Sequence, residues 1–92
     1  MARIILKGSE LRIAAGVAAS TNVGNATLVR VLNPTATAAV IHVQDPAALN
    51  EYSGIGTYTI AGSGVDFVEK QPTYTIHSES AVYVTKVGFS GI

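Results

Sequence analysis

The chain contains no cysteine and no tryptophan, and few of its residues are charged. The absence of cysteine excludes disulfides, thiolate metal sites and thiol nucleophiles. The absence of tryptophan removes a common aromatic platform for carbohydrate binding. Charged residues make up 13% of the chain, against about 25% in ordinary soluble domains. A surface with so little charge is easily covered by another protein, because few charges have to be desolvated.

The chain also lacks the features of nucleic-acid-binding, exported and membrane proteins. The formal net charge is zero, and no basic stripe is present for a phosphate backbone, so nucleic acid is not expected as a partner. A neutral chain does little to oppose self-association, which we expect.

The apolar run Ile4–Leu6 ends at Lys7 and is too short for a signal peptide core. No stretch approaches the roughly 20 apolar residues of a membrane span. We therefore expect synthesis in the cytoplasm and no membrane partner.

Strand-forming residues dominate what is present. Val, Ile, Thr and aromatic residues occur in short alternating runs separated by Gly, Pro, Asn and Ser. This pattern predicts an all-β fold, an antiparallel β-sandwich of about seven or eight short strands in a single domain over residues 1–92. Residues 61–64 predict the turn of a hairpin between strands at 56–60 and 65–70. Asp45 and Pro46 predict one short helical turn over residues 45–50.

One strand and one loose segment are the candidate protein interfaces. In the strand 27–33, Val29 and Val31 point to one face, which leaves Leu28, Arg30 and Leu32 on the other. That second face is either an exposed protein contact or a surface buried within the domain. Residues 14–26 are predicted to form a loop or an extended arm that lies on a neighbour. The interface candidates outside the strand are Val17, Val23 and Tyr52.

Signals for catalysis or metal binding are weak. The two histidines, His42 and His77, have no further ligands at a recognisable spacing, so we expect no metal site. The glycine pairs at 54–56 and 62–64 lack the residues of a phosphate loop or a nucleophile elbow, and we interpret them as turns. The sequence therefore predicts no catalytic, cofactor-binding or metal residue, and we do not expect an enzyme.

A stretch of strands and turns resembles a known group of proteins. It comprises Gly-Thr-Tyr-Thr-Ile at 56–60, Val-Glu-Lys-Gln-Pro-Thr-Tyr-Thr-Ile at 68–76 and Ala-Val-Tyr-Val-Thr-Lys-Val at 81–87, with Leu-Val-Arg-Val-Leu-Asn-Pro upstream at 28–34. These features resemble small β-sandwich structural proteins in the virions of tailed bacteriophages. The resemblance covers about two-thirds of the chain and transfers no functional residues.

The resemblance implies a structural role in a virion. It suggests a capsid decoration or cement protein that binds the major capsid protein or other virion proteins, is made in the host cytoplasm and has no cofactor. A neck, tail or fibre component is the alternative within this class. A small carbohydrate- or receptor-binding module is the alternative from another class.

Overall fold

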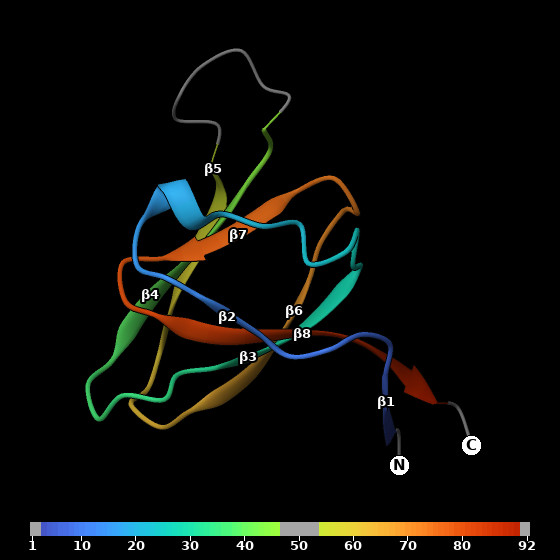
Figure 1. Ribbon diagram of the computed structural model, residues 1–92, viewed down its shortest axis with the longest axis horizontal. Coiled ribbons are helices and arrows are strands. Elements are labelled where there is room, and N and C mark those ends of the chain that lie inside the picture. The colour runs from blue at the N-terminus through green and yellow to red at the C-terminus, as the bar shows by residue number, and fades with distance from the viewer. Residues whose placement is uncertain (1–2, 47–53, 91–92) are drawn as a thin grey trace.

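The computed structural model describes residues 3–46 and 54–90 (Figure 1). Its elements are β1 (Arg3–Leu6), β2 (Leu11–Ile13), the 3-10 turn η1 (Val17–Ala19), β3 (Leu28–Leu32), β4 (Ala39–Gln44), β5 (Gly54–Ile60), β6 (Val65–Glu69), β7 (Thr75–Ser78) and β8 (Val82–Ser90). The strands form two antiparallel sheets, which confirms the predicted all-β, sandwich-like fold. Within the described residues, no helix is long or apolar enough to cross a membrane. Most of the helical turn predicted at 45–50 lies outside these residues.

The larger sheet has the order β1-β8-β3-β6, and β2 also pairs with β8. Strands β1 and β2 follow one another along the same side of β8, because Leu6 lies opposite Val87 and Leu11 lies opposite Val84. The residues between them form an irregularity in this edge strand, in which the Lys7 N–H still donates to the Lys86 carbonyl at 2.9 Å. The larger sheet is therefore bounded by β1 and β2 on one side and by β6 on the other.

The smaller sheet has the order β5-β4-β7. Strand β4 is central, since it pairs with β5 on one side and with β7 on the other. On the far side of β7, Thr21 forms a two-way backbone bridge with Ile76, with N–H to carbonyl distances of 3.2 and 2.9 Å. The chain preceding β3 thus closes one edge of this sheet.

A single core lies between the two sheets. Val29 and Val31 of β3, which alternation placed on one face, are fully buried, and Ile41 of β4 faces them from the other sheet. The buried apolar cluster takes residues from both sheets and from the segment before β3: Ile13, Val23, Ala26, Val29, Val31, Ala39, Ile41, Val43, Ile60, Ile76, Val82 and Val84. Burial of this cluster provides the main driving force that holds the sheets face to face.

The predicted hairpin across residues 61–64 is wrong. The Gly64 N–H donates to the Ala61 carbonyl at 2.9 Å, so the turn is present. However, β5 pairs with β4 in the smaller sheet, whereas β6 pairs with β3 in the larger one. The turn therefore carries the chain from one sheet to the other. The loop between β3 and β4 makes the same crossing in the opposite direction.

Asn33 fastens these two crossings together. Its buried side-chain amide donates to the carbonyls of Thr37 at 2.8 Å and Ala61 at 3.2 Å. Its amide oxygen accepts hydrogen bonds from the N–H and the hydroxyl of Thr35 at 3.1 and 2.8 Å. One side chain thereby satisfies polar groups from both loops at the end of the sandwich.

The segment 14–26 packs on its own domain. The side chain of Val23 is 2% exposed and Ala26 is fully buried, and both belong to the core between the sheets. Val23 adopts a positive φ of 55°, which is costly for a β-branched residue. Its apolar side chain gains burial in return. This segment is a covering loop with one 3-10 turn, and its core contacts are made within the chain.

Candidate interaction surface

The outer face of the larger sheet is the candidate interaction surface. Because Val29 and Val31 point into the core, the neighbours Leu28, Arg30 and Leu32 point to the opposite face of the sheet. All three are half-buried in the structure. The strand pairing places further apolar side chains beside them, and the surface comprises Leu28, Arg30, Leu32, Val65, Phe67 and Tyr83.

Two of the added residues are well exposed. The side chains of Val65 and Phe67 in β6 are exposed by 41% and 44%. Val65 lies opposite Leu32 and Phe67 lies opposite Arg30, so β6 extends the face of β3 outward. On the other side of β3, Tyr83 of β8 lies opposite Leu32. A continuous row of large side chains therefore crosses three strands.

An ion pair crosses this face. The Arg30 guanidinium lies 3.7 Å from the Glu10 carboxylate, with side-chain exposures of 29% and 46%. Strand β8 runs between the two residues, and Thr85, which lies opposite Arg30, is buried. The charge of Arg30 is thus balanced within the chain, so a partner covering this face has little net charge to desolvate.

The structure separates the interface residues that the sequence suggested. Leu28, Arg30 and Leu32 lie together on the outer face, as predicted. Val23 was predicted as a contact for a partner, but its side chain is buried in the core of its own domain. Tyr52 and the side chain of Val17 lie outside the described residues.

Val65, Phe67 and Tyr83 were not identified from the sequence. Alternation within 65–69 places Val65 and Phe67 on one face of their strand, and that signal was available. What the sequence could not provide is the neighbour of that strand. The pairing of β6 with β3 is what brings these side chains beside Arg30.

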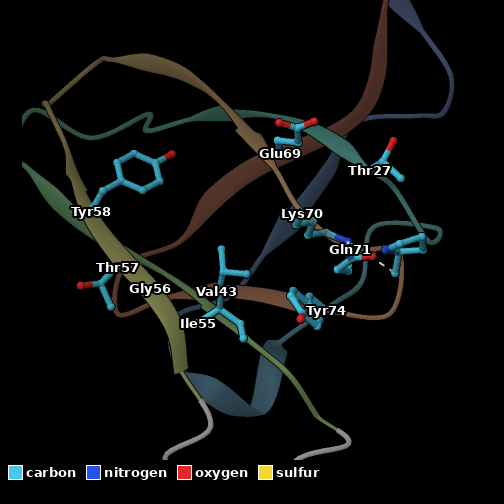
Figure 2. A pocket seen from close by; sticks show the side chains of 11 residues that line it. Thr27, Val43, Ile55, Gly56, Thr57, Tyr58, Glu69, Lys70, Gln71 and Tyr74 are labelled. Carbon is cyan, nitrogen blue, oxygen red and sulfur yellow. Dashed lines mark hydrogen bonds between the residues drawn. The ribbon is translucent and has the colours of Figure 1, made fainter.

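A groove of about 650 Å³ opens between the two sheets on the side of β5 and β6. Figure 2 shows Ile55 and Tyr58 of β5 on one side, with Lys70, Gln71 and Tyr74 on the other. Apolar and polar groups both line it, and the backbone of Gly56 forms part of its wall.

Lys70 lines this groove and binds backbone groups beside it. The residue is 7% exposed, and its ammonium donates to the carbonyls of Ala26 at 2.7 Å and Asn22 at 3.0 Å. Longer contacts reach the carbonyls of Gln71 and Pro72. Burial lowers the pKa of the Lys70 ammonium from its ordinary value. The lysine is fully occupied in holding the covering loop to the end of β6, and its role is structural.

Tyr58 also lines this groove. Its side chain extends from β5 into the space between the sheets (Figure 2). The hydroxyl is buried and has no hydrogen-bond partner among the described residues. Burial, helped by the charge of Asp66, raises the pKa of Tyr58 to about 12. The phenol is therefore neutral.

His42 and His77 form a stacked pair on β4 and β7. They lie directly opposite each other in the sheet, with ring centroids 4.6 Å apart and planes within 2° of parallel. His42 Nε2 lies 3.7 Å from a carboxylate oxygen of Glu79. Parallel rings direct their nitrogens side by side and not toward one point. Among the described residues, no three potential ligands form a metal-binding group.

We compared the chain with known protein families, curated proteins and solved structures. No family model, no curated protein and no solved structure matches this chain. The functional argument therefore depends on the residues and surfaces described above.

Proposed function

We propose that this protein is a structural subunit of a virion, a decoration or cement protein on the head of a tailed bacteriophage. The observation that carries the proposal is the outer face of the larger sheet, where Leu28, Leu32, Val65 and Phe67 surround the balanced charge of Arg30. The major capsid protein is the proposed partner. The sequence resemblance to small virion proteins supplies the virion context, and a neck, tail or fibre position is the alternative.

The composition supports a role in assembly. A chain with 13% charged residues and zero net charge loses little solvation when a neighbour covers its surface. A face of apolar side chains with one arginine at its centre has the composition of protein interfaces, in which aromatic and arginine side chains are enriched. A rigid sandwich also presents such a face without an ordering cost on binding.

The first test is binding to heads that lack the protein. Phage heads assembled without this chain are incubated with the purified protein and sedimented, and the bound fraction is quantified. We expect saturable binding to the heads. Replacement of Leu28 by Asp or of Arg30 by Glu buries an unpaired charge at the contact and should weaken binding by about tenfold or more.

The matched control is Thr59→Asp, which places the same new charge on an exposed position of β5. That variant should bind like the wild type. Far-UV circular dichroism verifies that every variant is folded. Retained binding in both Leu28→Asp and Arg30→Glu would remove the outer face from the interface, and no binding of the wild-type protein to heads or to tails would refute the virion role.

The groove favours a second candidate function, the binding of a glycan or other small receptor group. Tyr58 offers a buried hydroxyl without a partner, and Tyr74 lines the opposite wall. In that case Tyr58→Phe and Tyr74→Ala would each reduce retention on a glycan array, while Leu28→Asp would leave retention unchanged. The structural role predicts no glycan retention by the wild-type protein.

A further inference from the structure

The two outer edges of the larger sheet carry opposite charge. On one edge, residues 3–7 contain Arg3 and Lys7 and no acid. On the other edge, β6 contains Asp66 and Glu69 and no base. Within the described residues, β1 pairs only with β8, and β6 pairs only with β3. Each edge therefore has a side that a further strand can join.

We infer that a second copy of this chain joins the larger sheet head to tail, with β1 of one copy pairing antiparallel to β6 of the next. The orientation follows from the topology. Strand β1 runs antiparallel to β8, β8 to β3, and β3 to β6. The edges β1 and β6 therefore run in opposite directions, so copies placed in the same orientation along the sheet pair antiparallel.

Hydrogen-bond directions at the two edges are compatible. The Lys7 N–H donates inward to β8, so by alternation the N–H of Ile4 points away from β8. The Lys70 N–H donates inward to Thr27, so the N–H of Glu69 points away from β3. A register that places Ile4 opposite Glu69 lets these two residues exchange hydrogen bonds between copies.

The same register matches the side chains. It places Lys7 opposite Asp66, two opposite charges, and Ile5 opposite Val68, an apolar pair. Arg3 then lies opposite Lys70, whose ammonium is buried and donates to backbone carbonyls of its own chain. Leu6, which is 69% exposed, then lies opposite Phe67. In this register, each face of the sheet in one copy continues into the same face of the next copy. A shift of one residue between β1 and β6 would place side chains of opposite faces beside each other.

Charge favours the pairing of β1 with β6 over the pairing of two β1 strands or of two β6 strands. A two-fold contact between two β1 strands would bring Arg3 and Lys7 of each copy together, and a contact between two β6 strands would bring four carboxylates together. Strand β5, the edge of the smaller sheet, contains no charged residue and offers no such selection. A head-to-tail contact is heterologous, so it produces a closed ring or an open chain, according to the rotation between copies.

Sedimentation velocity of the isolated protein tests the inference, which does not rest on the virion role. We expect association that grows with protein concentration and weakens as salt is added. Lys7→Glu and Asp66→Lys should each weaken association about tenfold, because an attractive pair becomes repulsive. A mixture of the two variants, and a chain that carries both substitutions, should regain it.

Two further variants complete the design. Glu79→Lys alters the net charge as much as Asp66→Lys does, at an exposed position away from both edges, and should associate like the wild type. Ile4→Pro removes an N–H that points away from β8 and should leave a folded monomer. A wild-type protein that stays monomeric at high concentration, or a Lys7→Glu variant that associates more strongly, would overturn the inference. Binding to phage heads is measured separately, so either proposal can fail without the other.

Discussion

Two buried polar side chains, Asn33 and Lys70, tie the loops of this protein to its sheets. Asn33 satisfies backbone groups from both loops at one end of the sandwich. Lys70 does the same at the other end, where its ammonium donates hydrogen bonds to the carbonyls of Asn22 and Ala26. A buried group of this kind is costly when a partner is missing, so each one favours a single loop conformation.

His77 should make the protein less stable in mild acid. Burial, together with the nearby His42, lowers the pKa of His77 in the folded protein below its ordinary 6.5, although Glu79 opposes this shift. The unfolded chain therefore takes up a proton at a higher pH than the folded chain does. The free energy of unfolding should fall as the pH drops below about 6.5, and should be fully retained above it.

Urea unfolding of the wild type and of His77→Gln at several pH values between neutral and mildly acidic measures this effect. The variant keeps every carboxylate, so the acid-dependent contribution of those groups is common to both proteins. We expect a shallower loss of stability with falling pH in the variant. Equal slopes for the two proteins would show that His77 does not contribute.

At the scale of elements, the crossing from β3 to β4 and the crossing from β5 to β6 lie in close contact. A Cβ atom on Gly62 would collide with the backbone carbonyl of Ala36 in the neighbouring crossing. We expect Gly62→Ala to lower the free energy of unfolding by about 2 kcal/mol or more, because the obstacle is backbone and cannot rotate away. Urea titration measures this change.

The control for that substitution is Gly56→Ala in β5, where an added Cβ meets no atom within 4 Å. Its free energy of unfolding should stay within about 0.5 kcal/mol of the wild type. A Gly62→Ala variant as stable as Gly56→Ala would mean that the two crossings are not packed as described.

The crossing at 61–64 also shows where prediction from sequence stops. Gly62 and Gly64 indicate a turn, and the alternation on each side indicates a strand, and both are found. A hairpin and a crossing between sheets need the same turn residues and the same alternation. The distinction is made by Asn33, which lies 28 residues before Ala61 in the sequence and binds its carbonyl. No local pattern contains that contact.

At the scale of the molecule, both sheets share one buried cluster, and the chain crosses between them four times, after β3, β5, β6 and β7. Neither sheet can bury its apolar face alone, so we expect one cooperative unfolding transition. Tyrosine fluorescence and far-UV circular dichroism should give coincident urea curves. Two separated transitions would show that one sheet remains folded without the other.

The candidate site was partly predictable for the same reason that the fold was. Alternation along 27–33 placed Leu28, Arg30 and Leu32 on the face opposite Val29 and Val31, because successive side chains of a strand point to opposite sides. The same rule could not recover Val65, Phe67 or Tyr83 as members of that face. Their positions depend on which strands pair, and pairing joins residues far apart in the chain.

The sequence by itself determined that this chain forms strands, where most of them lie and which side chains of β3 share a face. Those properties follow from alternation and turn residues, which act within a few positions. The tertiary structure decided which sheet each strand joined, that Val23 is buried within its own domain and that the basic and acidic segments bound the same sheet. These outcomes depend on the shared burial of distant segments, and no short stretch of sequence encodes them.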